Sequence, residues 1–220
     1  MIQKTTLSFL TKIKSNNNRD WFEKNKSHYV TAKEDVENNI AEVIAGIRKF
    51  DKRIPADLDA KKCVFRIYRD VRFSKDKRPY KNNLGASIGP GGKKDFAPGY
   101  YVHVQPGASF VAGGMWMPEP EHLAKIRQEI DYNTAEFLKI LKEKNFKKFF
   151  GQLSNEDTLV NPPKGYEKDH KAIEFLKLKS FIVVADLKDK DVLGKNYVKS
   201  VVEICKAMQP LNNFLQRAID

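Results

Sequence analysis

The chain has 220 residues, with 40 Lys and Arg against 28 Asp and Glu, which gives a formal net charge of +12. Hydrophobic residues make up 41% and charged residues 31%, a balance that supports a buried core and excludes a disordered chain or a collagen-like fibre. At this length one compact domain suffices, so we expect residues 1–220 to form a single domain. The basic balance points to an anionic partner, and it specifies neither a fold nor a reaction.

The N-terminal part of the chain predicts helices. Thr6 is a candidate cap for a short first helix, and a second helix is expected to begin near Arg19. The apolar positions of that second helix follow steps of three and four: Val36, Ile40, Val43, Ile44, Ile47 and Phe50. Residues 63–69 alternate apolar and polar side chains and predict a strand, and residues 84–88 predict a short one.

The rest of the chain continues with strands and then helices. Residues 99–105 and 109–112 are expected to form a hairpin turned at Pro106-Gly107, with Gly113-Gly114 at a bulge or a close backbone approach. The patterns then predict helix over 119–150, a strand over 181–185, and mostly helix over 189–218, bent or interrupted at Pro210. Helices at both ends of a run of strands indicate an α+β fold: a mainly antiparallel sheet with helices from the N-terminal and C-terminal parts packed against it.

The excess positive charge is confined to a short window. Residues 61–94 hold 11 Lys and Arg and only two acids, Asp70 and Asp76, so this window alone carries a net charge of +9. All other residues together contribute +3. The charge therefore indicates a localised site and not a generally basic surface.

Within this window, residues 65–81 alternate cations with large apolar side chains. Strand alternation would place one set of side chains on a single face: Arg66, Tyr68, Asp70 and Arg72. Two guanidinium groups on one wall suit a phosphate or a carboxylate, because each offers paired donors in a fixed geometry. We therefore predict an anionic small molecule as the partner, bound by Arg66, Tyr68, Arg69, Arg72 and Lys77.

The same segment also fits a structural interpretation, in which its arginines pair with Asp70, Asp76 and backbone carbonyls. Two acids cannot neutralise seven nearby cations, and partly buried unpaired charges are costly, which favours the anion site. Under the structural alternative, Arg72→Ala would unfold the protein and would not change ligand binding.

The pattern R-x-x-R-D-x-R-F followed by D-K-x-x-Y, at residues 66–73 and 76–80, resembles the signature of the bacterial domain of unknown function family 2461. Further stretches are similar to that family, so the resemblance spans most of the chain: residues 18–22, 99–103, 113–118 and 163–166. The resemblance implies a single bacterial domain and supports the choice of site. It implies no reaction.

Four side chains are candidates for catalytic proton transfer, and nothing in the sequence ranks them: Asp70, Asp76, Tyr80 and His103. His103 would act on a bound anion if its strand face meets Arg66 and Tyr68. Trp116, beside two glycines, is a further candidate to line the ligand cleft. The sequence therefore leaves open whether the protein is an enzyme.

Other partners follow from the same features. The four histidines show no metal-ligand spacing, so we expect no metal and no cofactor. Nucleic acid is the alternative partner, bound through residues 61–94 with Phe73 and Tyr80 as stacking groups. The longest apolar run is strand-length, so no membrane partner is expected, and Cys63 and Cys205 are expected to be buried and reduced in the cytoplasm. The sequence assigns no oligomeric state.

Overall fold

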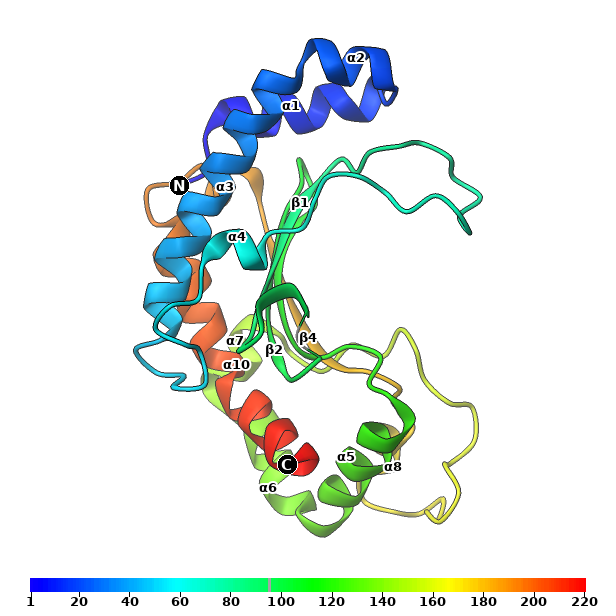
Figure 1. The fold of residues 1–220 in the computed structure, drawn as a ribbon. Coiled ribbons are helices and arrows are strands. Elements are labelled where there is room, and N and C mark those ends of the chain that lie inside the picture. Colours follow the sequence, from blue (N-terminus) through cyan, green and yellow to red (C-terminus); the bar gives the residue numbers. More distant parts are fainter. Residues whose placement is uncertain (95) are drawn as a thin grey trace. The chain divides into compact units, whose positions relative to one another are not determined.

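The computed structural model describes residues 1–94 and 96–220 (Figure 1). The fold is α+β, as predicted, with one antiparallel sheet in the strand order β1-β2-β3-β4. The strands are β1 (Leu84–Ile88), β2 (Gly99–Val104), β3 (Ser109–Met115) and β4 (Phe181–Leu187). Each strand therefore pairs with the next one along the chain, which agrees with the expected antiparallel sheet and its hairpin.

The helices lie before and after the first three strands in the chain. The N-terminal ones are α1 (Lys4–Ser15), α2 (Arg19–Lys24), α3 (Lys26–Ile47) and α4 (Ala60–Cys63), and a 3-10 turn, η1 (Gly92–Lys94), follows β1. The later ones are α5 (Pro120–Tyr132), α6 (Thr134–Lys142), α7 (Lys144–Phe149), α8 (Ile173–Leu176), α9 (Asp189–Val192) and α10 (Tyr197–Ile219). The helical stretches predicted over 119–150 and 189–218 are confirmed, each divided into shorter helices, and Pro210 lies inside α10.

The described residues divide into two compact units, each built from several chain segments. The first unit comprises Met1–Asp95, Tyr101–Val111 and Asp186–Glu203. The second comprises Phe96–Tyr100, Ala112–Ala185 and Ile204–Asp220. Strands β2, β3 and β4 contribute residues to both units, and the single domain expected from the sequence stays a prediction.

In the first unit, α3 packs against α1, α4 and β1. Its buried face holds five of the six positions that the sequence pattern predicts, Val36, Ile40, Val43, Ile44 and Ile47, whereas Phe50 lies beyond the end of α3 and is half-buried. Full burial of a Val, Leu or Ile side chain contributes about 1.5–3 kcal/mol each, so this face is a major source of stability. This face packs α3 against the two elements that flank the basic segment in the chain, α4 before it and β1 after it.

In the second unit, the predicted close approach at Gly113-Gly114 is confirmed. A Cβ at Gly113 would collide with Met208 Sδ of α10, and one at Gly114 would collide with the Phe181 carbonyl oxygen of β4. Gly114 also has a φ of +108°, which side chains rarely adopt. Glycine therefore allows β3 to contact its neighbours closely on both sides.

Two local predictions are wrong. Helix α1 begins at Lys4, and Thr6 instead donates a hydrogen bond to Asp35 Oδ2 at 2.6 Å. Residues 63–69 form no continuous strand, because Cys63 ends α4 and only two isolated bridges follow, Val64 to Ala86 and Tyr68 to Tyr80. The returning side holds two more residues than the outgoing side between these bridges, which breaks the ladder.

Candidate functional site

The basic segment forms a long hairpin, which we call the basic arm (residues 64–83). Figure 1 shows it leaving α4, turning, and returning into β1. Backbone hydrogen bonds join its two sides: Phe65 N donates to Gly85 O, Arg69 N to Pro79 O, and Lys81 N to Ile67 O, at 2.8–2.9 Å. Seven Lys and Arg and two Asp are thereby gathered on one narrow ribbon.

The arm is held against the N-terminal helices by one amide and one aromatic stack. Asn17 Nδ2 donates to the Tyr80 carbonyl at 2.9 Å, and Tyr80 N donates back to Asn17 Oδ1 at 3.0 Å. The ring of Phe22 in α2 stacks on Tyr80 at 4.1 Å between centroids, and both side chains are buried. Two stretches of the family resemblance, residues 18–22 and 76–80, therefore meet in this contact.

Three Asp-x-Arg triplets of the chain adopt the same clamp: residues 51–53, 70–72 and 76–78. In each, the aspartate Oδ1 accepts the arginine N–H and Nε–H at 3.0–3.2 Å, and Oδ2 accepts from Nη2 at 2.6–2.7 Å. Each guanidinium is thus turned back onto its own backbone turn. Two of the three clamps stabilise the tip of the basic arm.

The clamps hold the aspartates of the arm in the ionised form. Hydrogen bonds from Arg72 lower the pKa of Asp70 to about 2. Hydrogen bonds from Arg78, with a further one from Arg69 Nη1 at 2.6 Å, hold the pKa of Asp76 well below its usual value. Both carboxylates therefore already carry arginine partners, and neither is poised to exchange a proton near neutral pH.

The side chains of three cations of the arm have no hydrogen bond or ion pair within the described part of the chain: Arg66, Lys75 and Lys81. Arg66 and Lys75 are exposed, whereas Lys81 is partly buried. Burial lowers the pKa of the Lys81 ammonium, and the positive charges of Arg66 and Arg69 lower it further. Lys81 Nζ lies 5.5 Å from the Phe65 ring centroid.

Beside Lys81 is one face of β2. Tyr101 Oη lies 3.1 Å from His103 Nδ1, and His103 Nε2 lies 3.1 Å from Gln105 Oε1. The Tyr101 ring lies 6.3 Å from the Phe65 ring. Burial lowers the pKa of His103, and the Lys81 charge lowers it further. This face therefore brings a phenol and a neutral imidazole next to an uncompensated cation.

The structure divides the predicted site residues into two groups. Arg66 lies near Lys81, which is not among the ligand-binding residues expected from the sequence, and Lys81 in turn lies near His103. Arg72 is paired with Asp70 and Lys77 donates to the Val71 carbonyl at 3.0 Å, so both serve the turn. Tyr68 is 41% exposed and packs beside Phe22 and Tyr80. Trp116 follows β3 in the second unit and is 76% exposed.

Sequence reasoning missed several of these contacts. The Asp-x-Arg triplet recurs three times in the printed sequence, and this repetition was a readable signal for the clamps. No comparable signal marks Asn17, because its partner Tyr80 lies 63 positions away. The sequence also showed no sign of the role of Gly85. A Cβ at this position would collide with Tyr101 Oη, so glycine makes room for the phenol.

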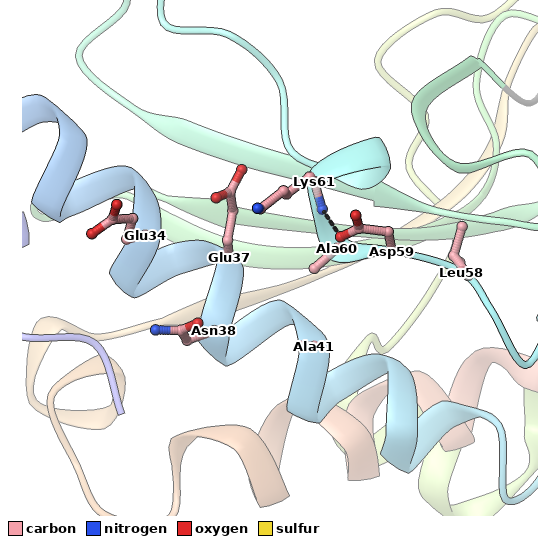
Figure 2. Close-up of a pocket in the computed structure, with 8 residues that line it drawn as sticks. All are labelled: Glu34, Glu37, Asn38, Ala41, Leu58, Asp59, Ala60 and Lys61. Atoms are coloured by element: carbon pink, nitrogen blue, oxygen red, sulfur yellow. Dashed lines mark hydrogen bonds between the residues drawn. The ribbon is translucent and has the colours of Figure 1, made fainter.

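Two hollows of about 420 Å³ lie outside this site. Figure 2 shows the first, between α3 and the segment leading into α4, lined by Glu34, Glu37, Asp59 and Lys61 among others. Three carboxylates and one lysine give this hollow a net negative charge, which repels an anion. Asp59 is also engaged as the cap of α4. The second, in the second unit, is lined by mixed charges and by Tyr132 and Tyr166.

Within residues 1–94 and 96–220, no cluster of three or more His, Cys, Asp or Glu side chains is arranged to hold a metal ion. No helix of these residues combines the length and the apolar character needed to cross a bilayer.

Comparison with known proteins gives one match. The model of a family described as conserved hypothetical protein (DUF2461) matches residues 5–214. No curated protein and no solved structure matches the chain.

Proposed function

The chain belongs to the conserved hypothetical protein family DUF2461, and we propose that it binds a phosphate- or carboxylate-bearing small molecule through Arg66 and Lys81 of the basic arm. His103 and Tyr101 on β2 would then adjoin the bound anion and supply hydrogen bonds or proton transfer. The site of this proposal is narrower than the one expected from the sequence. Arg72 and Arg78 are assigned to the clamps, and Arg69 is paired with Asp76, which Arg78 also binds.

One observation carries the proposal. Lys81 is a partly buried cation with no carboxylate partner among the described residues, and two arginines nearby make its charged form less favourable still. A charge withdrawn from water without a partner is costly, and so is a group of like charges. An anion bound beside Arg66 and Lys81 would remove both costs at once.

The first experiment measures the thermal unfolding midpoint in inorganic phosphate and in citrate. A ligand at 100 times its Kd stabilises the folded state by about 2.7 kcal/mol, which raises the Tm of a domain of this size by several degrees. We expect this rise in the wild type and its loss in the double variant Arg66→Gln/Lys81→Gln.

Two variants of the same arm serve as matched controls. Lys75→Gln removes an exposed lysine, and Arg72→Gln removes a clamped arginine, so both keep the phosphate response if the site is at Arg66 and Lys81. A response that is absent in the wild type, or equally weakened in all three variants, would contradict the proposed site.

A second candidate function is binding of single-stranded nucleic acid by the tip of the arm. What supports it is Phe73, which is 96% exposed between the two clamps, with the Arg72 guanidinium 5.8 Å from its ring centroid. Tyr80, the other stacking group expected from the sequence, has its ring stacked on Phe22 and is 4% exposed. Phe73 would therefore be the stacking residue in this candidate function.

This second candidate is tested by fluorescence anisotropy with a labelled oligothymidine. Binding through phosphates gives a log affinity that falls by about 0.7 per contact for each log unit of salt. Phe73→Ala should weaken binding by about 1–3 kcal/mol, the range of one base–aromatic stack. Binding that is absent at low salt, or indifferent to Phe73, argues against this function.

We further propose that the protein acts in the cytoplasm of a bacterium. Cys63 and Cys205 are both buried and free, which suits a reducing compartment. Burial raises the pKa of the Cys63 thiol to about 11, so this thiol has little thiolate character. Detection of the protein in a cell fraction outside the cytoplasm would contradict this placement.

A further inference from the structure

The hydrogen-bonded row on β2 has a defined direction. Tyr101, His103 and Gln105 alternate with the buried Val102 and Val104, so the three polar side chains share the partly exposed face of the strand. The contacts from Tyr101 Oη to His103 Nδ1 and from His103 Nε2 to Gln105 Oε1 join them end to end. Because each hydrogen bond has a donor and an acceptor, the order of donors along the row decides whether Tyr101 Oη can still donate or can only accept.

The direction follows from the amide. The Gln105 side chain turns its oxygen, Oε1, toward His103 Nε2, and because an amide oxygen can only accept, we assign the proton of His103 to Nε2. A neutral imidazole then offers a lone pair at Nδ1, and the Tyr101 hydroxyl must donate to it. The Tyr101 oxygen is left with lone pairs alone, so a ligand atom next to it has to be a hydrogen-bond donor.

Two packing features fix this row in place. The His103 ring stacks on Phe110 at 4.5 Å between centroids and 12° between planes. The Tyr101 hydroxyl occupies the space above Gly85, where a Cβ would collide with it. The acceptor is therefore presented in a preorganised position, which lowers the cost of binding.

The acceptor and the cations share a neighbour, Phe65. Its ring lies 5.5 Å from Lys81 Nζ and 6.3 Å from the Tyr101 ring. The groups facing His103 are Tyr101 on its own strand, Gln105 just after the end of that strand, Phe110 on β3, and the ammonium of Lys81 on the arm. A ligand that spans Phe65 would reach both Lys81 Nζ and Tyr101 Oη.

We infer that the ligand is a hydroxylated anion, a phosphorylated or carboxylated polyol, whose hydroxyl group donates a hydrogen bond to Tyr101 Oη while its anionic group is bound by Arg66 and Lys81. This inference rests on the proposed function and specifies the class of its ligand. A plain alkyl phosphate would satisfy the cations and leave the phenolic acceptor without a donor. The site would therefore prefer the polyol.

The test is calorimetric binding of two pairs of phosphate esters: glycerol phosphate against propyl phosphate, and ribitol phosphate against pentyl phosphate. Members of a pair carry the same charge and differ in their hydroxyl groups. One neutral hydrogen bond corresponds to about two- to tenfold in affinity, so we expect the wild type to prefer the polyol ester of at least one pair by that factor. Tyr101→Phe should abolish the preference, because the polyol ester loses its hydrogen-bond acceptor and the alkyl ester does not.

The outcomes separate the inference from the proposed function. If no ester binds, the proposed function fails and the inference fails with it. If esters bind without preference for the polyol, or if Tyr101→Phe weakens both members of a pair equally, the inference is overturned and the anion site stands. Tyr132→Phe, which alters an exposed tyrosine of the second unit, should change neither affinity.

A second measurement tests the direction of the row without any ligand. The nitrogen chemical shifts of His103 at neutral pH should identify Nε2 as the protonated nitrogen and Nδ1 as the bare one. A proton on Nδ1 would reverse the row and overturn the inference.

Gly85→Ala should displace the phenol and reduce the polyol preference in the same way as Tyr101→Phe.

Discussion

At the scale of single residues, the clearest anomaly is the neighbourhood of Lys81. Its ammonium shares a partly buried space with two arginines and faces an imidazole whose pKa is itself lowered. Stability alone would favour an apolar side chain here, so the lysine is better explained by a ligand than by the fold. The electrostatic coupling between Lys81 and His103 can be measured directly.

We predict that His103 titrates below 6.5 and is neutral at pH 7. Burial disfavours the imidazolium, and the charge of Lys81 repels it. Lys81→Gln removes the repulsion, so the measured pKa should rise toward the ordinary value, although burial still holds it down. An NMR titration of the ring protons provides the values. Equal values in the wild type and the variant would contradict the coupling.

At the scale of elements, the basic arm behaves as two parts with different supports. The tip, residues 70–78, is stabilised by its own clamps, and the base is held by Asn17 and Phe22. Changes at the tip should therefore leave the rest of the first unit intact, whereas changes at the base should loosen the arm from the helices. The structural interpretation of Arg72, in which its loss unfolds the protein, fits poorly with a side chain that is 76% exposed.

Asn17→Ala is predicted to destabilise the protein by about 1–3 kcal/mol. The substitution removes both hydrogen bonds to the Tyr80 backbone and leaves a buried residue with unsatisfied groups. Denaturant unfolding measures the loss, and hydrogen exchange should rise along residues 64–83. Asn16→Ala is the matched control, because the Asn16 side chain bonds only to the Lys12 carbonyl at the end of α1. Similar losses in both variants would argue against the docking contact.

The clamps of the tip are predicted to open in acid. Because the folded-state pKa values of Asp70 and Asp76 are lowered, their contribution is present above about pH 4 and is lost as the pH falls through those values. The amide signals of Arg72 and Arg78 report the opening, since each N–H donates to the aspartate. In Arg72→Gln the pKa of Asp70 should rise toward its ordinary value of 3.8, so its protonation should occur at a higher pH.

The sequence was informative for several local patterns. The α3 periodicity, the 99–112 hairpin and the close approach at Gly113-Gly114 depend on neighbouring residues, and all three are confirmed. The strand expected over 63–69 is wrong, because two extra residues on its partner side break the ladder and no property of 63–69 itself reveals them. The site shows the same division: its location followed from charge, whereas the sorting of arginines into clamped and unclamped required the fold.

At the scale of the whole molecule, the +12 charge is less uniform than a count implies. Within the basic arm, the pairing of Arg69, Arg72 and Arg78 with two aspartates leaves the positive potential centred on residues whose charges have no partner among the described ones. Net charge of this kind favours solubility and attracts anions, and it destabilises the compact state by repulsion. The protein is therefore expected to exchange some stability for binding.

Lys81→Met is predicted to stabilise the free protein by up to about 0.5 kcal/mol, a small gain because the ammonium is still partly solvated. The same variant should lose its stabilisation by phosphate. Denaturant unfolding with and without phosphate measures both quantities, and Lys75→Met, on the exposed side of the arm, should change neither. A variant that is less stable in both conditions would show that Lys81 serves the fold.

The Asp-x-Arg clamps also bear on how the chain folds. Each clamp joins residues two positions apart, so it closes a very small loop and can form in the unfolded chain within the time of local turn formation. The contact between Asn17 and Tyr80 spans 63 positions and must await the assembly of α1, α2 and β1. The tip of the arm can therefore take its shape before the base of the arm docks on α1 and α2.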